Sequence, residues 1–123
     1  MIYTTYFAKL NKLPENVVPI AICKWVPEGL RLSCYHYPEL APKPDFFYEY
    51  KRTGDTEHFT KCYNEQVLAK LDPHYIVEAL TAWVGGKDIA FVCYEKPTDF
   101  CHRHLVSAWL SNAGLACEEY REN

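Results

Sequence analysis

The residues best suited to do chemistry lie between positions 91 and 104, where an apolar stretch leads through a short proline-containing loop into a helical pattern. The helical part opens with Cys101, His102 and Arg103. A thiol, an imidazole and a cation therefore lie where a helix presents unpaired N–H groups and positive potential. Such a position suits an anion and converts a thiol into a thiolate.

One interpretation is an anion site, in which backbone N–H groups near Cys101 and the forked donors of Arg103 hold a phosphate. Tyr94 and Glu95 end the preceding strand and face the same place, and Glu95 is suited to accept hydrogen bonds from a ribose or a base. In the structural alternative Arg103 pairs with Glu95 or Asp99 and fixes the loop.

A second interpretation is nucleophilic catalysis by Cys101, with His102 or His104 as acid or base. The Cys-x5-Arg loop of phosphatases is absent, because seven residues separate Cys93 from Cys101 and one separates Cys101 from Arg103. A third is zinc held by Cys93, Cys101, His102 and His104. Adjacent helical residues point about 100° apart, and the sequence has no Cys-x-x-Cys pair, so we predict no metal and no cofactor.

These residues also carry a family resemblance. Residues 92–96 and 101–103, followed by Leu105-Val106-x-x-Trp109-Leu110, resemble the signature of the DUF488 family, small proteins without an assigned function. Residues 40–43 and 86–89 are similar to a compact form of that family in bacteria and phages. The resemblance extends over nearly the whole chain. It implies a small Rossmann-like α/β fold with a ligand site or active site around Cys101-His102-Arg103, and it implies no reaction.

Two residues outside this segment are further candidates. Lys43 lies in a rigid loop bounded by prolines and, supported by the resemblance, is expected to meet a second phosphate; a solvated surface lysine is the alternative. Tyr6 is one of several tyrosines that can offer a stacking surface to a base, although tyrosines in strands more often pack half in and half out.

Composition limits the classes of function. The chain has 123 residues, of which 49% are hydrophobic, so we expect one domain over residues 1–123 with a core of its own. A net charge of -3 gives no support to general binding of nucleic acids or anionic membranes. The sequence shows no signal peptide and no run of roughly 20 apolar residues that would span a bilayer. We expect six reduced cysteines and a cytoplasmic location.

The order of elements predicts an α/β fold. Strands are expected at residues 2–7, 17–23, 89–94 and 115–120, and helices at 45–51, 57–71, 73–84 and 101–112. Pro19 indicates an edge or a bend, and Asp45 and Asp72 are the expected N-caps. Residues 24–44 read as a long proline-rich loop, a length that usually means function or a missed element. Strands alternating with helices favour a single small Rossmann-like open sheet, mostly parallel and flanked by helices.

Two functions of different classes follow. The first is a module that binds a nucleotide-like or other phosphate-bearing small molecule around Cys101-His102-Arg103. The alternative is a cysteine-dependent enzyme that uses Cys101 with His102 or His104 on a nucleotide or nucleic-acid component. The many aromatic residues and the proline-rich segment also allow a homodimer surface, which the sequence does not separate from internal packing.

Overall fold

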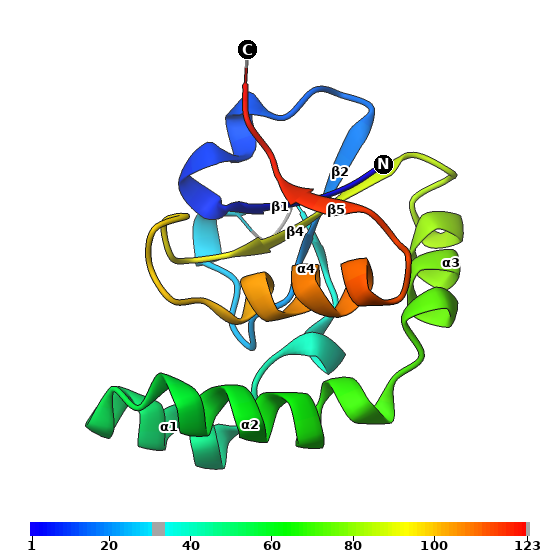
Figure 1. Ribbon diagram of the computed structural model, residues 1–123. Helices are drawn as coiled ribbons and strands as arrows, with labels where there is room; N and C mark the ends of the chain where they lie inside the picture. The colour runs from blue at the N-terminus through cyan, green and yellow to red at the C-terminus, as the bar shows by residue number, and fades with distance from the viewer. Residues whose placement is uncertain (31–33, 123) are drawn as a thin grey trace.

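The protein is built on one five-stranded sheet (Figure 1). The structure, a computed structural model, describes residues 1–30 and 34–122. The strands are β1 (Ile2–Tyr6), β2 (Val17–Ala21), β3 (Tyr35–His36), β4 (Asp88–Cys93) and β5 (Cys117–Glu119). Their order is β3-β2-β4-β1-β5, and each of these pairings is parallel.

The described residues form four α-helices. They are α1 (Pro44–Thr53), α2 (Thr56–Gln66), α3 (Pro73–Trp83) and α4 (His102–Asn112), of which α3 and α4 contact the sheet. Helix α4 crosses β1, β4 and β5, and α2 packs on α4 and on α1, so that α1 and α2 lie beyond α4 from the sheet (Figure 1). The predicted α/β class with a parallel sheet flanked by helices is confirmed. Within the described residues no helix is long and apolar enough to cross a membrane.

Strand β4 is central, as its unbroken apolar sequence predicts. It lies between β2 and β1, and every residue from Ile89 to Cys93 is buried. Tyr6 of β1 is in register with Cys93, and Ala21 of β2 is in register with Val92. The carboxyl ends of these three parallel strands therefore meet at one edge of the sheet, which is where ligands bind in folds of this class.

The proline-rich segment contains structure that the sequence interpretation missed. Short 3-10 helices at Glu28–Leu30 and Pro38–Leu40 flank β3, and residues 31–33 of the expected loop lie outside the described part of the chain. A two-residue strand is too short to give a periodic signal. The edge prediction for Pro19 is also corrected, because β2 has neighbours on both sides. Its pairing with β3 begins only at Ile20, so the missing N–H of Pro19 costs no hydrogen bond to β3.

The first residues of three helices can be compared with the predicted N-caps. Asp72 caps α3 by accepting hydrogen bonds from the backbone N–H groups of His74 and Tyr75, as predicted. The N-cap of α1 is Lys43 and not Asp45, which lies in the first turn. Helix α4 begins at His102, one residue later than expected, and Cys101 is its N-cap in an extended conformation (φ −154°, ψ 143°).

Candidate functional site

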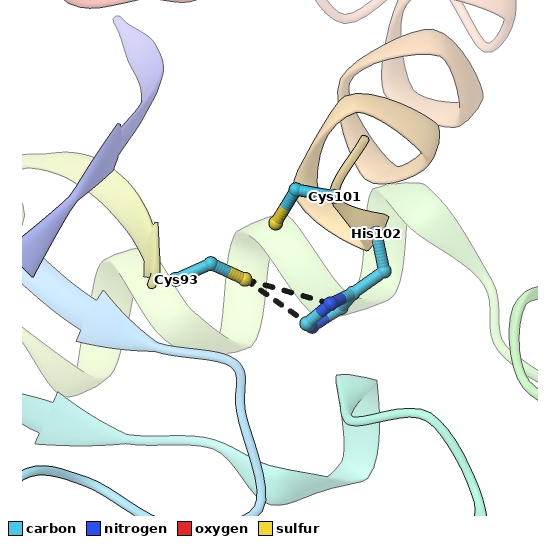
Figure 2. Close-up of side chains that lie close together, drawn as sticks. All are labelled: Cys93, Cys101 and His102. Carbon is cyan, nitrogen blue, oxygen red and sulfur yellow. Dashed lines mark hydrogen bonds between the residues drawn. The ribbon is translucent and has the colours of Figure 1, made fainter. Parts of the chain in front are cut away.

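Three side chains from the 91–104 segment form a buried cluster at the carboxyl end of β4 (Figure 2). Cys93 ends the strand, Cys101 caps helix α4 and His102 opens it. One ligand atom from each of the three lies within 4.8 Å of the others. The extended backbone of Cys101 is the reason, because it turns this side chain away from the direction that a helical residue would take.

The imidazole of His102 is held in one orientation. Its Nε2 lies 2.7 Å from the carbonyl oxygen of Ile22, which can only accept, so Nε2 carries a hydrogen and donates it. The ring of Tyr63 packs edge-on against it, with 5.5 Å between centroids. The Cys93 Sγ lies 3.5 Å from both Nδ1 and Nε2 (Figure 2). Because Nε2 is already a donor, Nδ1 is the nitrogen left to accept a hydrogen from a thiol.

The cluster contains ligand types that suit zinc. The prediction of no metal rests partly on the expectation that Cys101 is helical, and this expectation about Cys101 is wrong, since its backbone is extended. The three ligand atoms lie close enough together to hold a metal ion, so the absence of a metal stays a prediction.

The two sulfurs have opposite acid–base properties. A hydrogen bond from Cys93 lowers the pKa of the Cys101 thiol, with His102 and the backbone N–H of Arg103 contributing further and burial opposing. Burial raises the pKa of Cys93 well above its usual value, and the hydrogen bond to Cys101 raises it further. These opposite directions favour the proton on Cys93 and the negative charge on Cys101, and a thiolate is the nucleophilic form of a thiol.

Glu95 is an acidic group that interacts with this charge. Burial raises the pKa of its carboxyl, and the charge on Cys101 and a hydrogen bond with that residue raise it further. Lys51 of α1 opposes the shift, so its ammonium group acts on the same carboxyl. A carboxyl of this kind is protonated at a higher pH than usual and can donate a proton to a reacting group.

Arg103 is not directed to this place. Its side chain is fully buried, with 0% exposed, and its Nε and Nη2 each donate to the Glu119 carboxylate at 3.1 Å. Its Nη1 donates to the carbonyl oxygen of Glu95 at 2.6 Å. Burial alone would lower the pKa of Arg103, but the hydrogen bonds to Glu119 contribute to raising it. Arg103 therefore pairs with a carboxylate, as the structural alternative expects. The carboxylate is that of Glu119 in β5 and not that of Glu95 or Asp99.

A cavity of about 380 Å³ opens next to the cluster. Three segments form its walls: Cys23, Lys24 and Trp25 after β2; Pro42, Pro44, Phe47, Tyr48 and Lys51 around the start of α1; and Cys93, Tyr94 and Glu95 at the end of β4, with His102 beside them. Cys101 is 3% exposed and is not part of the lining, so it lies behind the residues that form the cavity floor. The volume is in the usual range for small-molecule sites.

The other predicted residues are dispersed. Tyr94 and Glu95 line the cavity, and the Tyr94 hydroxyl donates to the carbonyl oxygen of Trp25. Lys43 is exposed and does not line the cavity, although the prolines on either side of it do. Tyr6 lies outside the lining and packs its ring 5.6 Å from the Arg103 guanidinium. The His104 Nε2 is buried without a hydrogen-bond partner among the described residues, and His104 does not join the cluster.

Several cavity residues had not been identified as site residues. From the sequence, Cys93 is considered only as a zinc candidate, and Lys24, Trp25 and Lys51 are not among the candidates. A signal for Lys24 and Trp25 existed, because they follow β2, and parallel strands end at the same edge of a sheet. Lys51 had no such signal, because a helix that packs over the site from elsewhere in the sequence leaves no local pattern.

The wall formed by residues 40–44 depends on one buried hydrogen bond. The Tyr63 hydroxyl donates to the carbonyl oxygen of Leu40 at 2.6 Å, and both residues are fully buried. We expect Tyr63→Phe to lower the free energy of unfolding by about 1–3 kcal/mol, because the Leu40 carbonyl is left without a partner. Urea denaturation measures this loss. Tyr75→Phe removes an exposed hydroxyl and is the matched control; an equal loss in both variants would contradict the anchoring role.

Comparison with known proteins places this site in a family. Residues 3–114 match the family model DUF488-N3a, described as the "Active DUF488-N3 subclade". No curated protein and no solved structure matches the chain. The match spans the sheet strands β1 to β4, the four helices and the whole Cys93–Cys101–His102 cluster. The chain belongs to the DUF488 family.

Proposed function

We propose that this protein is a cysteine-dependent enzyme that acts on a small molecule bound in the cavity, with the thiolate of Cys101 as its nucleophile. The observation that carries the proposal is the Cys93–Cys101–His102 cluster, in which Cys101 holds the charge and Cys93 the proton. Cys93 and His102 line a cavity large enough for a ligand, and Cys101 lies next to them outside the lining, so attack by Cys101 requires the ligand to reach past these two side chains. A thiolate is the reactive form of cysteine, and a structural thiol has no need of it.

The roles of the neighbouring groups follow from their positions. The Cys101 sulfur donates an electron pair to an electrophilic carbon of the ligand, and the bond from that carbon to the leaving group breaks. Glu95 supplies the proton that the leaving group takes up. A water molecule then attacks the same carbon, and Glu95 removes a proton from this water. The bond between the carbon and the Cys101 sulfur breaks, which restores the thiolate. His102, fixed by the Ile22 carbonyl, keeps Nδ1 toward the sulfurs. Acid–base assistance of this kind contributes roughly 10²- to 10⁴-fold.

The second candidate is binding without chemistry, namely a module that holds a phosphate-bearing, nucleotide-like ligand. One observation favours it: Cys101 does not line the cavity, so a ligand resting there touches Cys93 and His102 first. Arg103 gives it no support, since Glu119 and Glu95 take its donors. The enzyme candidate requires a reduced Cys101, and we propose a cytoplasmic location because all six thiols are free.

Ultraviolet absorbance at 240 nm, where thiolates absorb and thiols do not, tests the proposal. The difference between wild type and Cys101→Ser should equal one thiolate and stay constant from pH 5 to pH 8, because the pKa of Cys101 is lowered and the group is already ionised there. Cys117→Ser is the control. Burial raises the pKa of Cys117, so this residue is a thiol between pH 5 and pH 8, and its replacement should not change the absorbance at 240 nm. A Cys101 difference that grows with pH, as for an ordinary thiol, would overturn the proposal.

Incubation with a panel of nucleotides separates the two candidates. An enzyme should convert one of them, shown by mass spectrometry of the small molecule, and Cys101→Ser should bind it without converting it. A binding module should return each nucleotide unchanged, with the same affinity in wild type and in Cys101→Ser.

A further inference from the structure

Three large aromatic side chains stand exposed around the cavity. Trp25 is 68% exposed, Tyr48 is 63% exposed and Tyr94 is 50% exposed, and all three line this cavity. They come from three different segments: the end of β2, helix α1 and the end of β4. Exposed aromatic rings brought together from separate segments form a surface on which a flat ring can stack.

Two cations stand on the same walls. The Lys24 Nζ lies 5.8 Å from the centre of the Trp25 ring, and the Lys51 Nζ lies 5.4 Å from the centre of the Phe47 ring. These contacts hold each ammonium group beside an aromatic wall. Lys51 and Glu95 both line this cavity, and the charge of Lys51 partly opposes the rise in the pKa of Glu95. The charged residues of the lining are Lys24, Lys51 and Glu95, so positive charges exceed negative ones by one when Glu95 is ionised and by two when it carries a proton.

We propose that the ligand of this cavity is a nucleoside monophosphate, with its base stacked on Trp25 and Tyr48 and its phosphate held between Lys24 and Lys51. The proposal deepens the proposed function by naming the class of ligand, and it rests on that function only in taking the cavity as the ligand site. Nucleotide recognition here does not use Arg103, which is paired with Glu119, or Lys43, which is not part of the cavity lining.

The charge of the site selects this class among flat anions. A phosphate monoester carries about −1.5 to −2 charges at pH 7, whereas a carboxylate carries one. Two lysines complement the first better than the second, and lysine binds phosphate as a point charge without needing a forked geometry. Glu95 opposes a second phosphate close to the cluster, which favours a monophosphate over a di- or triphosphate.

Isothermal titration calorimetry with AMP, GMP, CMP and UMP tests the proposal. The comparison ligands are the corresponding nucleosides, which lack the phosphate, inorganic phosphate, which lacks the base, and tryptophan, which carries a flat ring and a carboxylate. At least one monophosphate should bind more tightly than its nucleoside and than phosphate alone. Trp25→Ala should weaken that binding roughly 5- to 150-fold, the usual effect of removing one stacking side chain. Lys51→Ala should weaken monophosphate binding about tenfold and leave nucleoside binding unchanged.

Two variants serve as matched controls. Tyr75→Ala removes an aromatic ring as exposed as Trp25, at 68%, and Lys43→Ala removes a lysine next to the cavity but outside its lining; neither should change affinity. Binding no tighter for a monophosphate than for its nucleoside, preferred binding of tryptophan or phosphate alone, or equal losses in Lys43→Ala and Lys51→Ala would overturn the proposal. The affinity of Cys101→Ser should be unchanged, so a failure here is distinguishable from a failure of the thiolate measurement.

Discussion

Arg103→Ala is expected to lower the free energy of unfolding by about 3–5 kcal/mol, the usual cost of removing one partner from a buried ion pair. The guanidinium is fully buried and makes two hydrogen bonds to Glu119 and one to the backbone of Glu95. Its removal leaves the Glu119 carboxylate, 15% exposed, without its cation. A domain of this size has about 5–15 kcal/mol of stability in total, so the loss is a large part of it.

Urea denaturation followed by circular dichroism measures the effect. Arg52→Ala, which removes an exposed arginine at the end of α1, is the matched control and should stay within about 0.5 kcal/mol of wild type. Arg103→Lys keeps the charge but loses the forked geometry, and it should fall between wild type and Arg103→Ala. If Arg103→Ala proves too unstable to fold, Arg103→Lys still reports the loss. Equal stability of Arg103→Ala and Arg52→Ala would show that Arg103 is available to a ligand after all.

Arg103 has a structural role that bears on the site. It ties the first turn of α4 to β5 through Glu119 and to the preceding loop through the Glu95 carbonyl. Cys101 and His102 directly precede it, so this pairing fixes the point at which the helix begins and the direction in which both side chains project. The expected effect of Arg103 on function is therefore indirect, through the position of the cluster.

The local part of the site was predictable from the sequence. The apolar strand that ends at Cys93 and the helix that starts beside Cys101 belong to one continuous segment of the sequence. In parallel sheets, ligands bind between the end of a strand and the start of the following helix. The same alternation of strands and helices predicted the fold class. These inferences succeeded because strand and helix patterns depend on neighbours within a few residues.

The remaining parts of the site depend on contacts between distant positions. Arg103 finds Glu119 only once β5 has joined the sheet beside β1, and no local pattern distinguishes this glutamate from the other acidic residues near the C-terminus. Lys51 and Glu95 are far apart along the chain, and they line the same cavity only because the fold brings α1 to the cavity that the end of β4 also lines. The extended conformation of Cys101 is a local feature, but a one-residue shift in a helix start lies within the uncertainty of any pattern.

Cys101 is expected to react faster than Cys23 at pH 6. The two thiols are similarly buried, at 3% and 6% exposed, but a hydrogen bond from Cys93 lowers the pKa of Cys101, whereas burial raises the pKa of Cys23 to about 12. A much larger fraction of Cys101 than of Cys23 is therefore thiolate at pH 6. The lower basicity of Cys101 makes its thiolate a weaker nucleophile, which reduces the advantage without removing it.

Modification by methyl methanethiosulfonate, a small reagent that forms a disulfide with thiolates, measures this difference when the labelled peptides are quantified by mass spectrometry. The rate at Cys101 should be constant from pH 5 to pH 8, because its ionisation is complete below that range, whereas the rate at Cys23 should rise about tenfold per pH unit. Cys93→Ala removes the largest cause of the lowered pKa, so Cys101 should then react faster as the pH rises. If Cys101 in the wild type also reacted tenfold faster per pH unit, the charge would not reside on this sulfur and the assignment of the nucleophile would fail.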